Sequence, residues 1–194
     1  MDGAVARLLL NNPAKHNSLT AQGIDLFIDC LNRVEANKNI RVLVITGQGE
    51  KTFCAGASLE QMSSGDMTGE KFETLTDRLA AMPMPVVCAL NGSVYGGGSE
   101  LGLCCDYRIG VHGMRLKVPA AEIGLCYPMN GIRRYVKRLG VTTAKRILIS
   151  SEILESETLL RVGYLTHLVL QDQLETETMK LVESLLPLSP LTVA

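Results

Sequence analysis

The sequence lacks a charge imbalance. Nineteen Lys and Arg residues stand against twenty Asp and Glu residues, which leaves a formal net charge of −1 at pH 7. Proteins that bind nucleic acids or anionic membranes usually carry an excess of positive charge. The one basic cluster is short, and we interpret it as a solvated helix face; it comprises Arg133, Arg134, Lys137 and Arg138. We therefore expect neither nucleic acid nor a membrane as a partner.

Patterns typical of metal sites and disulfide frameworks are also missing. The six cysteines contain no C-x-x-C pair, and His16, His112 and His167 have no ligand-like spacing. We therefore expect no metal. Most cysteines lie among apolar neighbours, which favours buried reduced thiols over disulfides.

No charged leader with a long apolar stretch and a cleavage site is present near residue 1, and no apolar run approaches a membrane span. These absences predict a cytoplasmic protein, or an organelle-matrix form whose leader is not in this sequence. A length of 194 residues favours one domain, with a small second one as the alternative.

Short apolar runs alternate with helical patterns along the first two thirds of the chain. Strands are predicted at residues 4–11, 41–47 and 85–92. A helix is predicted after Ser18 or Thr20, either of which can cap it, and its buried stripe is Ile24, Phe27, Ile28, Leu31 and Val34. This order indicates an α/β protein with a largely parallel, ββα-type repeat.

Two further segments lie between the second and third predicted strands. Residues 51–62 read as a loop entering a short helix, for which Ser58 and Gln61 have the spacing of a capping box. The polar segment 63–71 reads as a surface loop, and 72–83 as a helix that stops at Pro83. Beyond Gly131 the patterns are mostly helical, at 132–140, 142–150, 155–163 and about 173–186, with one strand at 164–170.

Three consecutive glycines, Gly96, Gly97 and Gly98, follow the third predicted strand and precede Glu100. The dinucleotide fingerprint fails because Leu101 replaces its third glycine, and a P-loop fails because no Gly-Lys-Ser/Thr follows. The nucleophile elbow G-x-S-x-G fails at Leu101 as well. The remaining pattern is a strand, a bare-backbone turn and a helix start, which points N–H groups outward.

Outward N–H groups can bind a carbonyl oxygen and the oxyanion that forms from it. The other glycine-rich loop, "CAGAS", offers the Ala57 N–H as a second donor. Glu100, one turn along, would then reach the bound carbon chain, and apolar surroundings would raise its pKa. As a pattern alone, a structural turn with a surface glutamate is an equal alternative.

Four blocks of this sequence resemble the crotonase (enoyl-CoA hydratase/isomerase) superfamily. In order they are "NNPAKHNSL", "VLVITGQGEKTFCAGASLEQM", "PVVCALNGSVYGGGSELGLCCDYRIG" and "VPAAEIGL". With the "GYLTHLV" strand they cover most of residues 4–170, and the long third block is highly specific. The resemblance implies a ββα superhelix that binds acyl-CoA and stabilises a thioester enolate.

Site residues also follow from this resemblance. It assigns the oxyanion hole to the backbone N–H groups of Ala57 and Gly97, and the first of the family's two catalytic glutamates to Glu100. Backbone around Ala14, Lys15 and His16, with the loop Ala55 to Leu59 that includes Ser58, corresponds to the CoA-binding region. No separate cofactor is implied, because coenzyme A is part of the substrate. A homotrimer or a hexamer is expected.

The sequence departs from the family at the second glutamate. That position is Ala120, which can neither donate nor accept a proton. Glu122 would face the same side if the segment were extended, about 7 Å along the chain, and is a weaker catalytic candidate; a solvated or ion-paired Glu122 is the alternative. Tyr127 is another polar candidate, against a packing role. Ser58 also replaces an aspartate usual after the oxyanion alanine.

The resemblance divides the chain into a ββα core, 1–140, and a helical portion, 141–194, that is incomplete relative to the family. We expect an enzyme of the enoyl-CoA hydratase (lyase) or isomerase type in fatty acid metabolism, with one glutamate as acid and base. A reaction that needs only one carboxylate, such as shifting a double bond or hydrating an unusual acyl chain, suits these residues. The alternative is a catalytically inactive acyl-CoA-binding relative.

Overall fold

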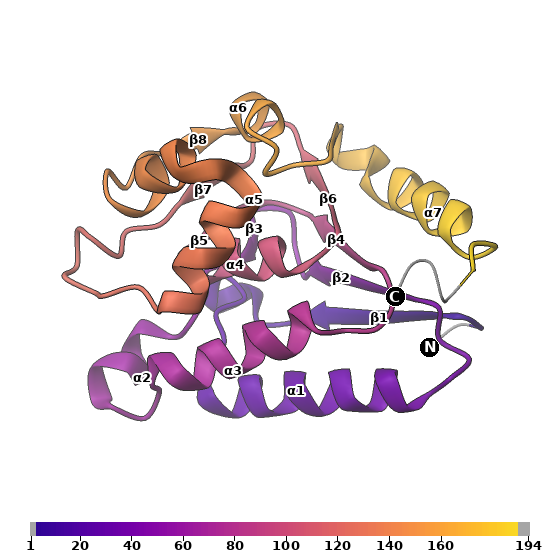
Figure 1. The fold of residues 1–194 in the computed structure, drawn as a ribbon, viewed down its shortest axis with the longest axis horizontal. Coiled ribbons are helices and arrows are strands. Elements are labelled where there is room, and N and C mark those ends of the chain that lie inside the picture. Colours follow the sequence, from indigo (N-terminus) through magenta and orange to yellow (C-terminus); the bar gives the residue numbers. More distant parts are fainter. Residues whose placement is uncertain (1–2, 190–194) are drawn as a thin grey trace.

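The computed structural model describes residues 3–189, which form two sheets wound together by helices (Figure 1). The larger sheet is wholly parallel, in the order β1-β2-β4-β6-β9. Its strands are β1 (Val5–Leu10), β2 (Val42–Gly47), β4 (Val86–Leu90), β6 (Tyr107–Val111) and β9 (His167–Val169). The predicted α/β class and its parallel sheet are confirmed.

The smaller sheet has the order β3-β5-β7-β8, and only its β7–β8 pair is antiparallel. Its strands are β3 (Thr52–Cys54), β5 (Ser93–Tyr95), β7 (Arg115–Lys117) and β8 (Leu154–Glu155). Successive strand pairs β2–β3, β4–β5 and β6–β7 each contribute one strand to each sheet, and a helical segment follows each pair. This is the expected ββα superhelix.

Helices cover both faces of the larger sheet. Figure 1 shows α1 and α3 side by side below the strands, with α7 above them. The α-helices are α1 (Ala21–Ala36), α2 (Leu59–Ser64), α3 (Gly69–Ala80), α4 (Gly97–Cys104), α5 (Met129–Leu148), α6 (Ser156–Arg161) and α7 (Leu174–Leu185). Two short 3-10 helices are η1 (Pro13–Lys15) and η2 (Gln171–Gln173).

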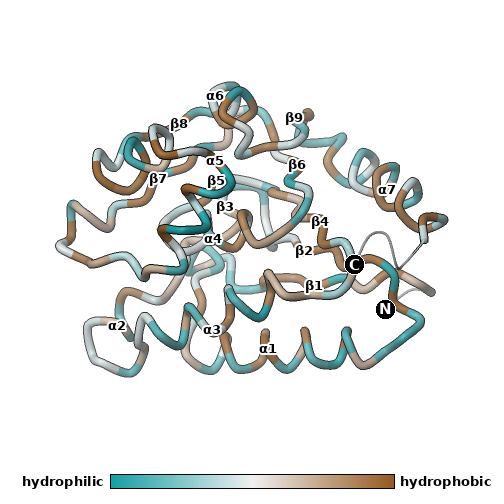
Figure 2. The backbone as a smooth tube through the Cα atoms, viewed as in Figure 1, coloured by the Kyte–Doolittle hydropathy of each residue, from teal (hydrophilic) through white to brown (hydrophobic). Residues whose placement is uncertain are grey.

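The predicted stripe of α1 points into the core. Ile24, Phe27, Leu31 and Val34 are buried, and Ile28 is partly buried against them. Burying one such side chain contributes about 1.5–3 kcal/mol relative to leaving it exposed. Figure 2 shows the resulting alternation of hydrophobic and hydrophilic residues along this helix. At its start Thr20, one of the two predicted caps, accepts a hydrogen bond from the Gly23 N–H at 3.0 Å.

Several predicted boundaries were wrong for local reasons. Thr52–Cys54 is a strand rather than a loop, because it pairs with β5. Three residues are too few to show the alternation that identifies a strand in a sequence. The predicted loop 63–71 is shorter, because Thr68 caps α3 at Gly69. The division into two helices expected at 132–140 and 142–150 is confirmed: within α5 the backbone of Gly140 is non-helical, with φ 78° and ψ 162°, and separates one helix from the next. The division into a core, 1–140, and a helical portion, 141–194, stays a prediction; residues 1–2 and 190–194 of these two regions lie outside the described part.

The capping box at α2 is half formed. Ser58 accepts a bond from the Gln61 N–H at 3.5 Å, as predicted. The Gln61 side chain instead accepts the Ala21 N–H at 2.7 Å, which ties α2 to the start of α1.

Steric requirements explain the triple glycine. Gly96 has φ 48° and ψ −129°, a conformation that is essentially restricted to glycine. A Cβ on Gly97 would lie 2.4 Å from the Phe72 ring, and one on Gly98 only 2.1 Å from the Cys54 carbonyl oxygen. Each glycine therefore allows a different close approach.

We predict that Gly98→Ala lowers the free energy of unfolding by at least about 2 kcal/mol, because the added methyl group collides with backbone that cannot move aside. Thermal and denaturant unfolding measure this. Gly69→Ala is the matched control, because its Cβ would meet nothing closer than the Pro128 ring at 3.8 Å. Equal stability of the Gly98 and Gly69 variants would contradict the steric explanation.

Candidate active site

The two glycine-rich loops meet at one edge of the smaller sheet. β3 and β5 are parallel neighbours, so the segments that follow them leave the sheet on the same side. A Cβ on Gly56 would lie 2.6 Å from the Gly97 nitrogen, which shows how closely the two backbones approach. The two loops that the sequence analysis expected to form one site are therefore in direct contact.

Ala57 and Gly97 both present a backbone N–H that donates to no acceptor in the part of the chain the structure describes. Gly97 is the first residue of α4, where helix geometry leaves N–H groups unpaired. Around Ala57, the neighbouring bonds run from Leu19 N–H to the Gly56 carbonyl and from Ser58 N–H to the Leu19 carbonyl, both at 2.8 Å. Two unpaired donors therefore border one space.

That space is a cavity of about 240 Å³. Its wall includes Ala57, Gly97 and Glu100 together with Ala120 and Tyr127. The rest of the lining is mainly apolar; it includes Ala55, Leu59, Met62, Phe72, Val118, Pro119, Ile123, Leu125 and Pro128. An apolar cavity with a few convergent polar groups is the usual form of a small-molecule site.

Glu100 is the carboxylate of this cavity and lies in the first turn of α4. Its side chain is only 3% exposed. The Tyr127 hydroxyl donates to its Oε2 at 2.8 Å, and Arg134 forms an ion pair with its Oε1. The alternative of a surface glutamate is therefore excluded.

Opposing effects set the acidity of Glu100. Burial, the largest effect, raises the pKa of its carboxyl group above the ordinary value. The hydrogen bond from Tyr127, the positive charge of Arg134 and a hydrogen bond from Thr76 oppose that rise in pKa. The net pKa is raised, as predicted from the apolar surroundings.

Arg134 corrects the interpretation of the basic cluster. It was predicted to be solvated, yet its side chain is only 11% exposed. Besides Glu100 it contacts the carboxylate of Asp77 on α3 at 2.7 Å, and Asn130 donates to the other Asp77 oxygen at 3.0 Å. Asn130 and Arg134 are four residues apart on α5 and so share a face. That spacing was visible in the sequence, but only the docking of α5 on α3 identifies the face as buried.

The segment after Val118 is not extended. Turn bonds from the Ile123 N–H to the Pro119 carbonyl, at 3.1 Å, and from the Leu125 N–H to the Ala120 carbonyl, at 2.9 Å, coil it. Glu122 therefore does not share a face with the buried Ala120: it is exposed, pairs with Lys117 at 2.9 Å and does not line the cavity. The ion-paired alternative describes its position.

The predicted CoA-binding segments lie beside one another. Ala14 and Lys15 belong to η1, and the His16 carbonyl accepts the Ala55 N–H at 3.0 Å. None of these first three lines the cavity, whereas Ala55 and Leu59 do. The Lys15 side chain is exposed at the surface, and its amino group lies 3.9 Å from the Glu60 carboxylate.

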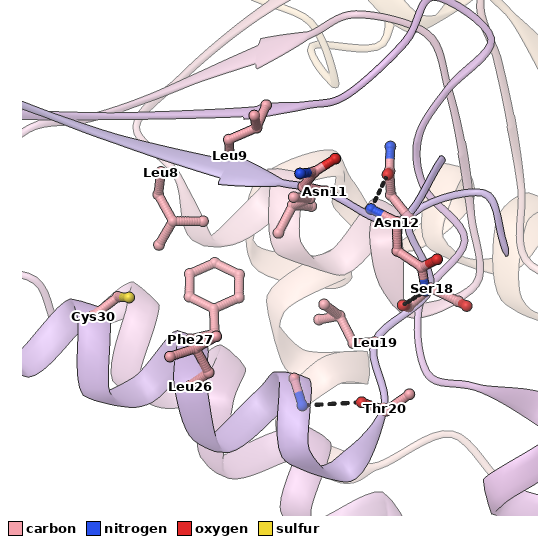
Figure 3. A pocket seen from close by; sticks show the side chains of 13 residues that line it. Leu8, Leu9, Asn11, Asn12, Ser18, Leu19, Thr20, Leu26, Phe27 and Cys30 are labelled. Carbon is pink, nitrogen blue, oxygen red and sulfur yellow. Dashed lines mark hydrogen bonds between the residues drawn. The ribbon is translucent and has the colours of Figure 1, made fainter. Parts of the chain in front are cut away.

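Another cavity, of about 270 Å³, lies between β1 and α1 (Figure 3). Leu8, Leu19 and Phe27 face it, and its lining holds no carboxylate. Polar groups there serve the local fold: the Asn12 N–H donates to the Asn17 side chain at 2.9 Å. Its only ionisable side chain is the thiol of Cys30, so it offers no counterpart to Glu100.

Residues 3–189 hold neither a metal-binding cluster nor a helix that could span a membrane. No cluster of three or more His, Cys, Asp or Glu side chains there could hold a metal ion. Within the same residues no helix is long and apolar enough to cross a membrane. All six cysteines are free, and four of them are buried, in line with the expected reduced thiols.

The two-sheet superhelix and its cavity define a member of the crotonase superfamily. Residues 1–194 match the family described as "Enoyl-CoA hydratase/isomerase", and the chain belongs to that family.

Individual relatives agree with this assignment. The chain is 29% identical to a crotonyl-CoA hydratase of Syntrophomonas wolfei, over 97% of this chain and 75% of that protein. The crystal structure of an enoyl-CoA hydratase from Bacillus anthracis is 27% identical and superposes with a TM-score of 0.92, covering 98% of this chain and 76% of that one. An enoyl-CoA hydratase structure from Mycobacterium tuberculosis is 31% identical, with a TM-score of 0.87 and coverages of 100% and 83%.

Removing the Arg134 charge should raise the pKa of Glu100 further. In Arg134→Gln the buried carboxylate loses its cation, so its pKa should rise above the wild-type value. Carbon NMR of the Glu100 carboxyl group across a pH series measures this shift. Arg133→Gln, an exposed neighbour on the same helix, is the matched control. The same Glu100 pKa in both variants would refute the assigned role of Arg134.

Proposed function

We propose that the Glu100 cavity binds an acyl-CoA thioester and stabilises its enolate, as an enzyme of the enoyl-CoA hydratase/isomerase type. The observation that carries this proposal is the convergence of two unpaired N–H groups, at Ala57 and Gly97, on a cavity that contains a buried glutamate. The family membership of the chain supports the same substrate class.

In this proposal the thioester carbonyl oxygen accepts both N–H groups. When Glu100 takes a proton from the carbon next to the carbonyl, the electron pair of that C–H bond moves onto the carbonyl oxygen. The two donors then stabilise the resulting negative charge, and removal of one such donor typically costs about 10²–10³ in rate. The apolar walls strengthen these interactions by excluding water.

The single carboxylate favours a reaction that moves one proton at a time. Hydration of a 2-enoyl thioester uses one group to hold the water and another to manage the carbon proton, and Ala120 supplies neither. Losing such a group costs about 10²–10⁴-fold in rate. We therefore propose double-bond migration, with hydration of an unusual acyl chain as the second option. Glu122 takes no part, because it is paired with Lys117 outside the cavity.

The coenzyme A portion would lie along the Ala14 to His16 turn and the loop from Ala55 through Ser58 to Leu59. This placement is supported by the hydrogen bond that joins the two segments and by the exposed Lys15 amino group, which suits a phosphate. No other cofactor is required, since the thioester itself supplies the carbonyl.

For the whole assembly we propose a cytoplasmic homotrimer or hexamer that acts in fatty acid metabolism. Exposed apolar side chains on and just beyond α5 support self-association; they are Met129, Val136, Val141 and Ile149.

A catalytically inactive acyl-CoA-binding protein is the second candidate. Ala120 favours it, and so does the engagement of both Glu100 oxygens by Arg134 and Tyr127. The burial of Glu100 beside two free donors favours the enzyme. Turnover decides between them.

Glu100→Gln should lower the rate of 2-enoyl- and 3-enoyl-CoA conversion by at least about 10²-fold, because the amide cannot accept a proton. Absorbance and mass spectrometry follow water addition and double-bond migration. Glu177→Gln, at a half-buried glutamate on α7 that does not line the cavity, is the matched control. Tight binding of acyl-CoA without turnover in the wild type would instead establish the inactive relative.

The wild-type pH profile tests the same role. A base must be ionised, so kcat/KM should fall as the pH drops through the Glu100 pKa. Because burial raises that pKa, the fall should begin at a higher pH than for an ordinary glutamate. An acid limb at or below the ordinary glutamate pKa would contradict Glu100 as the base.

A further inference from the structure

We propose that Tyr127 is a second catalytic residue, which donates a proton to the substrate and recovers it from Glu100. This inference rests on the proposed function and assigns the donor that Ala120 cannot provide. Tyr127 lines the same cavity as Ala120 and Glu100.

The two oxygens of Glu100 have different partners. Arg134 holds Oε1 as an ion pair, and the Tyr127 hydroxyl donates to Oε2 at 2.8 Å. A guanidinium group keeps its protons in proteins, so Oε1 is bound to a fixed charge. Oε2 is bound to a group that can give up a proton and take one back. Arg134 is therefore a positioning residue, and the proton exchange runs between Oε2 and Tyr127.

The Tyr127 ring is held in place on several sides. It meets the Tyr135 ring edge to face, with the centroids 5.7 Å apart and the planes at 85°. A Cβ on Gly131 would lie 2.6 Å from the Tyr127 ring and 2.9 Å from Glu100 Oε2, so only glycine leaves room for this pair. Packing therefore fixes the hydroxyl against the carboxylate.

The surroundings of Tyr127 keep its hydroxyl protonated. Burial, followed by the neighbouring Tyr135 and Glu100, raises the pKa of its hydroxyl well above the ordinary value. The group consequently carries its proton throughout the physiological range, whereas Glu100 can lose one. An acid and a base thus share one hydrogen bond, which is the arrangement a two-site proton transfer needs.

Double-bond migration in a 3-enoyl thioester moves one proton from C2 to Glu100 and another from Tyr127 to C4. Glu100 Oε2 takes the proton from C2, and the C–H electron pair forms the enolate held by Ala57 and Gly97. The enolate then reforms the carbonyl group, the double bond moves to C2–C3, and C4 takes the proton of the Tyr127 hydroxyl. The phenolate recovers a proton from Glu100 across their hydrogen bond, and both residues return to their starting forms.

Two reactions separate Tyr127 from Glu100. Exchange of the C2 hydrogens of butyryl-CoA in D₂O, followed by proton NMR, requires only Glu100 and the two donors. Migration of the double bond in 3-hexenoyl-CoA requires Tyr127 as well. In Tyr127→Phe we expect kcat for migration to fall by about 10²-fold with KM little changed, while C2 exchange is retained. The retained exchange also shows that the variant is folded.

Tyr107→Phe is the matched control, since it removes a tyrosine hydroxyl from a residue on β6 that does not line the cavity. Migration at the wild-type rate in Tyr127→Phe would overturn the proposal. Loss of both reactions in a variant with the wild-type melting temperature would also overturn it, because Tyr127 would then only position Glu100. Absence of C2 exchange in the wild type would refute the proposed function itself, and the role of Tyr127 with it.

If Tyr127→Phe does not fold, replacing tyrosine by the more acidic 3-fluorotyrosine keeps the hydrogen bond, and an unchanged kcat for migration would overturn the proposal.

Discussion

The approach of two backbones, at Gly56 and Gly97, is the constraint on which the rest of this site depends. It follows from the parallel pairing of β3 with β5, because both strands end at the same edge of the smaller sheet. Without side chains at these positions, the loop after one strand and the helix start after the other can share a wall. The position of Glu100 follows from that contact, since it lies in the first turn of the helix that begins there.

Electrostatics then gives the buried glutamate its partners. Burying an unpaired ionised carboxylate in an apolar cavity carries a large desolvation free energy. An ion pair with a cation, or uptake of a proton, reduces that free energy. Here the pairing comes from Arg134 on α5 and from Tyr127 in the loop just before that helix, while α3 provides Asp77 behind Arg134. Three helices that are distant in sequence thus converge on one side chain.

The sequence predicted the parts of this arrangement that depend on local pattern or on the family resemblance. Strands β1, β2 and β4, the stripe of α1, the Thr20 and Ser58 caps and the glycine turn could all be predicted, because each is encoded within a few neighbouring residues, whereas β6 was not predicted. Placement of Ala57, Gly97 and Glu100 around one cavity followed from the resemblance and agrees with the geometry. The strands of the smaller sheet were missed because two or three residues show no period.

Arg134 could not be assigned correctly, because burial of a charged helix face is decided by the helix that docks against it. Glu122 was considered on the assumption of an extended segment, and backbone bonds within residues 119–125 replace that assumption with a turn. In both cases the prediction needed the three-dimensional arrangement of the chain, which residue type alone does not give.

The main-chain origin of the two free N–H groups has a consequence for how such a site can change during evolution. A substitution at residue 57 alters the side chain but leaves the amide in place, whereas a substitution at residue 100, 120 or 127 adds or removes an acid or a base at once. The free N–H at residue 57 therefore persists through a change of side chain, whereas residue 97 must remain glycine, because a Cβ there would lie 2.4 Å from the Phe72 ring. Acids and bases can thus change one at a time around the same peptide framework, and Ala120, at the position where the family resemblance implies a glutamate, is a difference of that kind.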